Sequence, residues 1–396
     1  MLLSILTTEG KYITIMLFDT PELGAREIEV ISDINDLVEK LRLRLHDPHR
    51  WLGSLRRAQF ARAVQGSNSI EGYDAPVDDA AAIELGEAPL DADEETRAAI
   101  KGYCDAMTYV LQLSSEPDFQ YGDQLLKSLH FMMTCYDLKN RPGLWRSGSI
   151  YVRNDESGEI VYEGADIDDV PTLIHELVRE LNVEDSAPII VRAAMAHLNL
   201  VMVHPFRDGN GRMARCLQTL VLARSGVLSP VFCSIEEYLG RNTQAYYDVL
   251  ANVGRGSWNP GGDATQWVRF KLTAHLRQAQ TLHRRIKESE QLWDDLERLI
   301  AEKKLPYRTI NPLYDASMRY RVRNGMYRAV LAEAEEEISE QVATRDLKQL
   351  TEAGLLIPHG SARGRFYTAS ARLTGMRQSI IANRDTRDDS DPFSKS

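Results

Sequence analysis

Apolar residues recur every three or four positions along most of this chain, the spacing that places them on one face of an α-helix. This pattern predicts helices over residues 27–45, 51–64, 93–112, 122–136, 170–181, 187–203, 210–224, 234–253 and 264–302, and only a short helix within 74–92. Residues 187–203 are apolar nearly all round, as in a central buried helix. Residues 283–304 are polar with alternating charges, and we expect a solvated connector there.

One β-rich segment interrupts the helical pattern. The runs Ser149-Ile150-Tyr151-Val152-Arg153 and Glu159-Ile160-Val161-Tyr162 flank a turn-forming stretch at 154–158. This arrangement predicts a β-hairpin inserted into a helical protein. An isolated hairpin is only marginally stable, so we expect it to lie on a surface or over a site.

The C-terminal quarter of the chain has a different order of elements. Helical spacing over 318–334 and 339–354 is followed by two short strand-like runs at 355–357 and 365–368 around a basic loop. Two helices followed by a hairpin are typical of a winged helix-turn-helix. The tail from Asn383 is polar, and we expect it to be disordered.

Composition narrows the class of protein. The 396 residues are enough for two or three domains, and the net charge of −11 argues against nonspecific coating of nucleic acid or an anionic membrane. The cysteines are scattered without a C-x-x-C pair, so we expect free thiols in a cytoplasmic protein rather than a zinc site or disulfides. The first 17 residues fit neither a signal peptide nor a membrane span; a short hairpin around Glu9-Gly10 and a true start at Met16 both remain open.

The richest chemistry lies between two predicted helices, in the stretch H-P-F-R-D-G-N-G-R-M-A-R from His204 to Arg215. Residues 208–211 are turn-formers, so we expect a tight loop that presents backbone N–H groups and the positive end of the second helix to an anion. Glycine–asparagine turns are common without a ligand, and a helical histidine is more often a core residue than a catalyst. Histidine, carboxylate, glycines and two arginines together nevertheless favour a site for a nucleoside triphosphate with Mg²⁺. A metal site of His197 and His204 is disfavoured, because seven residues separate the rings by about 10 Å along a helix.

This stretch resembles the signature of the Fic family, H-x-F-x-[D/E]-G-N-G-R-x-x-R, at every specified position, and the resemblance extends over roughly residues 50–275. The resemblance implies a mainly α fold, a Fic-type helical core with an inserted β-hairpin flap, here followed by a winged helix-turn-helix domain. We expect an N-terminal segment at 1–48, an inhibitory helical region at 49–92, the catalytic core at 93–275, a helical connector at 276–304, the winged helix-turn-helix at 305–372 and a polar tail at 373–396.

The resemblance implies a protein adenylyltransferase, which transfers AMP from ATP onto a Ser, Thr or Tyr hydroxyl of a protein target and releases pyrophosphate. By position, His204 is the base that deprotonates the hydroxyl, Asp208 holds Mg²⁺, and Phe206 anchors the loop. The triphosphate contacts are the anion hole and the two arginines that follow it, namely Gly209, Asn210, Gly211, Arg212 and Arg215.

Two further sets of residues follow from the same resemblance. Adenine contacts are expected from Tyr246, Tyr247 and Leu250, and pairing with an extended target segment from the flap residues Ser149, Ile150, Tyr151 and Val152. The resemblance is also compatible with a homodimer. A different nucleotide-like donor is an alternative that the loop alone leaves open.

An upstream segment, Ser67-Asn68-Ser69-Ile70-Glu71-Gly72, matches the family's inhibitory motif, [S/T]-x-x-x-E-[G/N]. The resemblance implies that Glu71 pairs with Arg215 and takes the place of the γ-phosphate. Two alternatives stand beside this one. The spacing of Asn68 and Glu71 also fits a local capping box, and Glu71 could instead position water for removal of AMP from a modified protein.

The C-terminal block supports a second class of function. It carries more basic than acidic residues, although the chain as a whole is acidic. Arg345 and Lys348 on the predicted recognition helix, with Arg363 and Arg365 in the wing, are placed to contact DNA phosphates. A DNA-binding regulator is therefore the rival hypothesis, although Asp346 and Glu352 interleave the basic residues and winged helices also serve as protein-contact modules.

Overall fold

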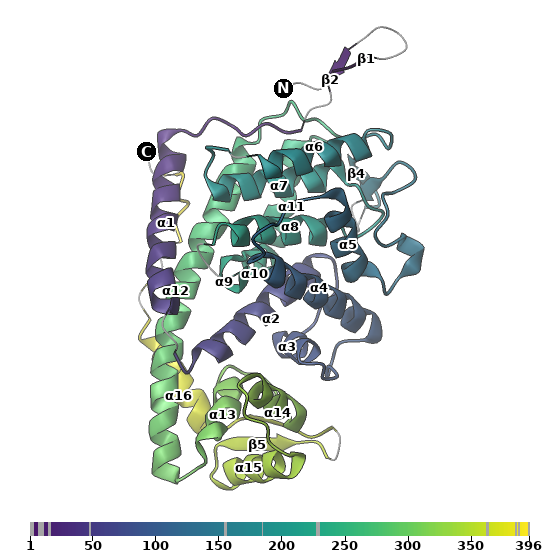
Figure 1. Cartoon of the computed structure of the whole chain (residues 1–396). Coiled ribbons are helices and arrows are strands. Elements are labelled where there is room, and N and C mark those ends of the chain that lie inside the picture. The colour runs from purple at the N-terminus through teal and green to yellow at the C-terminus, as the bar shows by residue number, and fades with distance from the viewer. Residues whose placement is uncertain are drawn as a thin grey trace.

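A computed structural model of the chain describes residues 4–6, 12–14, 17–46, 49–153, 157–183, 185–226, 230–361, 364–384, 386 and 389–394. The described part is mostly helical and contains three separate two-stranded antiparallel sheets (Figure 1). None of its helices is both long and apolar enough to cross a lipid bilayer. The expected mainly α fold class with an inserted hairpin is confirmed.

Two helices form the centre of the largest helical body. Helices α7 (Ile189–Val203) and α8 (Asn210–Arg224) pack against each other and are buried along nearly their whole length. Around them lie α4 (Glu94–Leu113), α5 (Asp123–Thr134), α6 (Val170–Asn182) and α11 (Thr243–Gly254) (Figure 1). The predictions for these elements from apolar spacing are confirmed, except for the segment that contains α11.

The single helix predicted over 234–253 is wrong. The chain forms α10 (Glu236–Arg241) and α11, which meet at the non-helical Asn242, and the short α9 (Pro230–Cys233) precedes them. The apolar spacing continues through the break, but tertiary contacts fix α10 independently. Its Gly240 lies against the backbone of Gly66, and its Glu237 carboxylate accepts two hydrogen bonds from Arg285, each of 2.6 Å.

The predicted inhibitory region contains α2 (Leu52–Ile70) and α3 (Val77–Glu84). Helix α2 is longer than predicted, because it continues past Val64 through Ser67 to Ile70. Helix α1 (Ala25–His46) lies beside the long α12 (Thr265–Lys303) (Figure 1).

The expected solvated connector in the second half of α12 is wrong. Leu292, Leu296 and Ile300 are buried in a second hydrophobic core. This core also receives side chains from α13 (Ile310–Ser317), α14 (Asn324–Glu333), α15 (Glu340–Glu352) and α16 (Ala371–Ala382). One face of the charged segment is thus apolar at helical spacing, and the C-terminal elements pack on that face.

The helix predicted over 318–334 is also wrong at its start. Residues 318–323 are not helical: Arg319 has a positive φ of 70°, and Val322 pairs with Tyr367 as an isolated bridge. Strands β5 (Leu356–His359) and β6 (Phe366–Ala369) form the antiparallel hairpin predicted after α15, and a 3₁₀ turn (Tyr307–Thr309) precedes α13. The elements thus follow in the predicted order, while the winged helix-turn-helix assignment itself stays a prediction. Arg363 lies outside the described residues.

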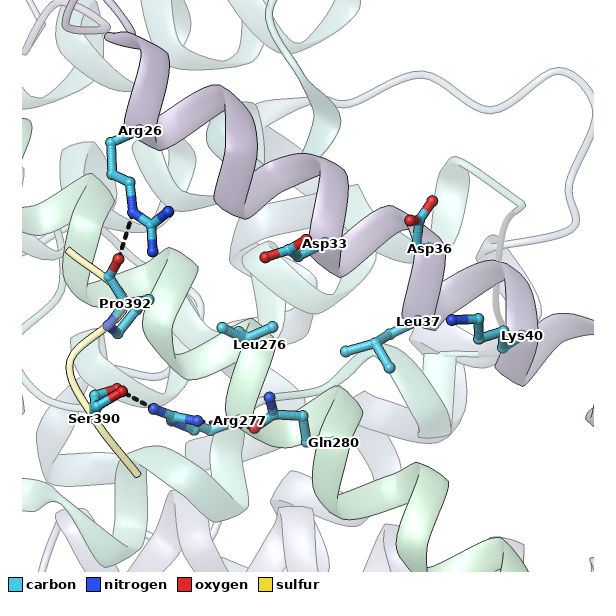
Figure 2. Close-up of a pocket in the computed structure, with 10 residues that line it drawn as sticks. All are labelled: Arg26, Asp33, Asp36, Leu37, Lys40, Leu276, Arg277, Gln280, Ser390 and Pro392. Carbon is cyan, nitrogen blue, oxygen red and sulfur yellow. Dashed lines mark hydrogen bonds between the residues drawn. The ribbon is translucent and has the colours of Figure 1, made fainter. Parts of the chain in front are cut away.

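The expected polar tail at 373–396 is wrong where the structure describes it. Leu373 and Ile380 of α16 are buried, and residues 389–394 lie across α1 and α12. Pro392 O accepts a 2.6 Å hydrogen bond from Arg26 Nε, and Ser390 O accepts one from Arg277 (Figure 2). Backbone carbonyls, which a polar composition does not reveal, make these contacts.

Two hairpins complete the fold. Strands β3 (Tyr151–Arg153) and β4 (Ile160–Glu163) form the predicted flap, with a 3₁₀ turn (Leu138–Asn140) upstream of it. Residues 154–156 of its turn lie outside the described residues. Strands β1 (Ser4–Leu6) and β2 (Tyr12–Thr14) pair antiparallel as one reading of the N-terminus predicted, and Glu9-Gly10 lies outside the described residues.

Candidate active site

The loop between α7 and α8 is held by its own backbone and by Asn210. Helix α7 ends at Val203 and is capped by His204, which has a φ of 54°, and Gly209, with a φ of 75°, immediately precedes α8. Asn210 Oδ1 accepts a hydrogen bond from Phe206 N, and Asn210 Nδ2 donates one to Phe206 O, both 2.9 Å. The Phe206 ring is fully buried, as predicted. The Asn210 side chain therefore closes the loop through both of its polar atoms.

The hydrogen bond of the His204 ring defines its free nitrogen. His204 Nδ1 lies 3.0 Å from Val201 O, and a carbonyl oxygen can only accept, so Nδ1 carries the proton. Burial lowers the pKa of His204 below its usual value, although the hydrogen bond to Val201 and the nearby Glu71 carboxylate oppose this. The ring is thus neutral near pH 7, and Nε2 has a lone pair that can accept a proton.

Asp208 lies at the edge of the loop with its carboxylate partly exposed. Its Oδ1 accepts a 2.7 Å hydrogen bond from Gly209 N, and its Oδ2 lies 3.3 Å from the amide nitrogen of Asn140. No group of three or more His, Cys, Asp or Glu side chains in the described residues could hold a metal ion. Mg²⁺ commonly binds through a single carboxylate together with phosphate oxygens and water, and Asp208 fits that mode.

The two arginines in the first turns of α8, Arg212 and Arg215, are almost completely buried. Arg212 lies over the ring of Tyr73 and donates to the hydroxyl of Tyr136 at 3.2 Å. Its Nε and Nη2, and Nη1 of Arg215, are buried donors with no hydrogen-bond partner among the described residues, although Arg212 Nη2 lies 3.6 Å from Asp208 Oδ2 as an ion pair. Buried donors without a hydrogen bond carry a desolvation cost, so their concentration here points to an anionic ligand.

The remaining donors of Arg215 bind the predicted inhibitory motif. Arg215 Nε donates to Ser67 Oγ at 2.8 Å, and Nη2 donates to Ser67 O at 2.9 Å and to Glu71 Oε1 at 2.6 Å. Burial by itself would raise the pKa of Glu71, but Arg215 and Arg212 hold that pKa below its usual value. The predicted pair is therefore present, with Glu71 as a carboxylate.

Glu71 also covers the start of α8. It is the C-cap of α2, and a Cβ added at Gly211 would overlap its Oε1. The capping-box alternative is wrong, because Asn68 and Glu71 lie at the C-terminal end of a helix rather than at its start. Asn68 Nδ2 donates instead to Val64 O, one turn back.

The predicted adenine contacts lie at different depths. Tyr246 is buried, and its hydroxyl lies 2.9 Å from His197 Nε2. Tyr247 is 44% exposed and donates to Ile70 O at 2.7 Å, and Leu250 is half-buried. His197 is a core histidine whose Nδ1 lies 2.8 Å from Gln218 Oε1, which leaves no ring nitrogen for a metal.

The flap joins the loop near its base. Tyr151 and Val152 lie in β3, whereas Ser149 and Ile150 precede the strand. A Cβ added at Gly164, just after β4, would lie 2.6 Å from the Ile150 side chain and 3.1 Å from His204 Cβ. The flap therefore begins beside the histidine.

Sequence reasoning missed two residues that hold the loop. Arg146 Nε donates to His204 O at 2.9 Å and its Nη1 to Gly148 O at 2.7 Å, which ties the loop to the flap. The ring of His130 stacks on Phe206 at 3.7 Å between centroids, with Nε2 2.9 Å from Asp208 O. Neither residue belongs to a motif. The only signal for His130 was its place on the apolar face of a predicted helix.

Comparisons with known proteins agree with this geometry. The model of the Fic/DOC family matches residues 122–222. Protein adenylyltransferase fic-1 of Caenorhabditis elegans is 43% identical over 99 residues, 24% of this chain and 17% of that protein. A probable protein adenylyltransferase of Aquifex aeolicus is 33% identical over 104 residues, 26% of this chain and 32% of that protein. The chain thus spans less than a third of the length of these relatives.

Two solved structures are similar over more of the chain. A Fic family protein from Desulfovibrio desulfuricans is 18% identical with a TM-score of 0.56, over 89% of this chain and 98% of that chain. The structure of Fic-1 from C. elegans is 25% identical with a TM-score of 0.54, over 67% of this chain and 74% of that chain. Residues 122–222 of this chain therefore match the Fic/DOC family in sequence, and the fold around them is similar to those of solved Fic structures.

Proposed function

We propose that this chain is a protein adenylyltransferase that transfers AMP from ATP onto a Ser, Thr or Tyr hydroxyl of a protein target. The observation that carries the proposal is the set of buried guanidinium donors of Arg212 and Arg215 near the start of α8 that have no hydrogen-bond partner among the described residues, together with His204, whose Nδ1 is bound to Val201 O. Such donors suit a polyphosphate, and the histidine suits the proton transfer that a hydroxyl nucleophile requires.

In the proposed reaction, His204 Nε2 takes the proton of the target hydroxyl while the hydroxyl oxygen bonds to the α-phosphorus. The bond from that phosphorus to the α–β bridging oxygen breaks, and pyrophosphate leaves with the electron pair. Arg212, Arg215 and the backbone N–H groups at the start of α8 stabilise the growing negative charge. Asp208 would hold Mg²⁺, which supplies further neutralisation of the phosphates.

Glu71 is the proposed inhibitor of this reaction. Its carboxylate contacts Arg215 and covers Gly211, so it competes with phosphate oxygens for the same donors. Removing one partner of a buried ion pair leaves the other unpaired and is costly, which favours this position of Glu71 until ATP replaces it.

The direct test is transfer of labelled AMP from ATP with Mg²⁺. We expect Glu71→Gly to raise labelling above wild type and His204→Ala to abolish it. The exposed Glu116, which lies after α4, provides a matched control, and Glu116→Gly should behave as wild type. Absence of label with both wild type and Glu71→Gly would overturn the proposed activity.

The same contacts support removal of AMP as an alternative, with Glu71 positioning water. A pre-labelled target separates the two reactions. Release of AMP that is lost in Glu71→Gly would favour removal, whereas unchanged release would exclude a role of Glu71 in it.

A second candidate function, DNA binding through α15, is favoured by one observation. The Asp346 carboxylate, which interrupts the basic residues in sequence, is buried and accepts hydrogen bonds of 2.6 and 3.0 Å from Arg308. The exposed side of α15 therefore carries Arg345 and Lys348 without that acid. A duplex that shifts in a salt-dependent manner, and less with Arg345→Ala, would support DNA binding. Binding that ignores Arg345→Ala would exclude this surface.

A further inference from the structure

A cluster of ionic contacts joins the C-terminal region to α3, the helix that follows Glu71. Arg321, in the non-helical stretch between α13 and α14, lies 2.5 Å from Asp78 Oδ2, 3.2 Å from Asp79 Oδ1 and 2.6 Å from Asp91 Oδ2. Asp78 and Asp79 form the first turn of α3 and are buried. One guanidinium therefore bridges three carboxylates outside its own region.

Asp79 also binds the loop that follows α3. Its carboxylate accepts hydrogen bonds from the backbone N–H groups of Leu90, Asp91 and Ala92 at 2.8, 2.8 and 3.0 Å. Arg321 and Asp79 together therefore fix both α3 and the loop that leads to α4.

The C-terminal region also touches α2 (Figure 1). The hydroxyl of Tyr320 lies 3.5 Å from Arg62 Nη1, and Glu333 of α14 lies 3.7 Å from Arg57 Nη1. The ring of Tyr320 is buried in the hydrophobic core that also contains α7 and α8. Both helices that flank Glu71 thus rest on the same region.

The link between these helices is short. Only residues 71–76 separate the end of α2 from the start of α3. Gly72 turns the chain with a φ of 83°, and Tyr73 N donates to Asn68 O at 3.1 Å. A shift of α3 by more than this link can absorb moves Glu71 relative to Arg215.

We propose that Arg321 is a positioning residue for the inhibitory Glu71, through which the C-terminal region holds α2 and α3 so that Glu71 stays on Arg215. This inference rests on the proposed function. Removing Arg321 leaves the buried Asp78 without its ion-pair partner, whereas Asp79 keeps its three backbone hydrogen bonds, and α3 must move to rehydrate Asp78. Loosening this contact raises the basal transfer of AMP.

The test combines Arg321→Ala with Glu71→Gly. We expect Arg321→Ala to raise labelling several-fold over wild type, and to add nothing when Glu71 is already glycine, because both changes act on the same contact. Amide exchange of Tyr73 and Asp91 should accelerate in Arg321→Ala. Arg372→Ala, which breaks an exposed pair with Glu302 at the α12–α16 contact, is the control expected to change neither readout.

Asp91→Asn is a milder variant, because the Asp91 side chain is 58% exposed, and it keeps the inference testable if Arg321→Ala fails to fold. Unchanged exchange at Tyr73 in a folded variant overturns the inference. So does a rise in labelling of equal size in the Glu71→Gly background. An inactive Glu71→Gly protein would instead refute the proposed function. The amide exchange of Tyr73 would then still show whether Arg321 holds α3 and the residues that follow Glu71.

Discussion

Replacing Gly66 with alanine tests how firmly α2, which carries the proposed inhibitory residues, is held against α10. A Cβ at Gly66 would lie 2.6 Å from Glu236 O and 2.9 Å from Glu237 Cα, and one at Gly240 would lie 2.7 Å from Gly66 Cα. The opposing atoms belong to the backbone, so no side chain can rotate away. Helices α2 and α10 must separate to accommodate the methyl group.

The expected change in the free energy of unfolding combines one stabilising and two destabilising contributions. Alanine in place of glycine inside a helix stabilises by roughly 0.5–1 kcal/mol. An ordinary contact needs at least 3.4 Å, so α2 must move by about 0.8 Å, and overpacking of this kind costs about 1–3 kcal/mol. The neighbouring Ser67 also moves, and its 2.8 Å bond to Arg215 Nε weakens, which adds about 1 kcal/mol. The destabilising contributions are larger, and we expect the free energy of unfolding to fall by about 2 kcal/mol.

Urea unfolding measures this loss, with Gly375→Ala of α16 as the matched control. Nothing lies within 4 Å of a Cβ at Gly375, so helix propensity acts alone there, and we expect a gain of about 0.5–1 kcal/mol. The reasoning is refuted if Gly66→Ala unfolds at the same or a higher urea concentration than wild type while Gly375→Ala is stabilised.

Three further perturbations address the pH dependence of stability, the contacts that hold Arg215 and the proposed Mg²⁺ site. Burial raises the pKa of Glu84 to about 8 from 4.5, so the folded state binds its proton more tightly, and stability falls as pH rises from about 4.5 to about 8. In wild type, this fall in the free energy of unfolding amounts to something on the order of a few kcal/mol between these two pH values, and Glu84→Gln should abolish it. An equal dependence of the free energy of unfolding on pH in both proteins would contradict this. Ser67→Ala leaves Arg215 Nε without its acceptor and should lower the free energy of unfolding by about 1–3 kcal/mol, whereas no loss in urea unfolding would show that the bond is dispensable. His130→Phe loses the bond to Asp208 O and should raise the Mg²⁺ concentration for half-maximal AMP transfer more than the KM for ATP; equal changes in both would argue for a general loss of structure.

Local signals made much of the helical body predictable. The apolar spacing of α7 and α8 and the turn residues between them are contiguous in sequence, so the loop and the order of its functional groups follow directly. The break at Asn242 did not follow, because the apolar spacing continues through it. Contacts of Gly240 with Gly66 fix that boundary, and these residues are far apart in the chain.

The same distinction holds within the site. Glu71 could be placed against Arg215 because each belongs to a recognisable motif, and the pair is present. Arg146 and His130 act through the backbone carbonyls of His204 and Asp208, and a carbonyl leaves no mark in the sequence. The docking of residues 389–394 was missed for the same reason, since Pro392 and Ser390 also bind through their carbonyl oxygens.

The end of α2 has a consequence for how this chain can vary. Gly66 sets the position of the helix on α10, and Ser67 and Glu71, one turn apart, both bind Arg215. Inserting or deleting one residue between Gly66 and Glu71 would rotate the carboxylate by about 100° and shift it by about 1.5 Å along the axis, away from the guanidinium. The number of residues between Gly66 and Glu71 therefore determines whether Glu71 reaches Arg215. Substitutions within this stretch change how tightly Glu71 is held, but a change in its length removes the contact between Glu71 and Arg215 altogether.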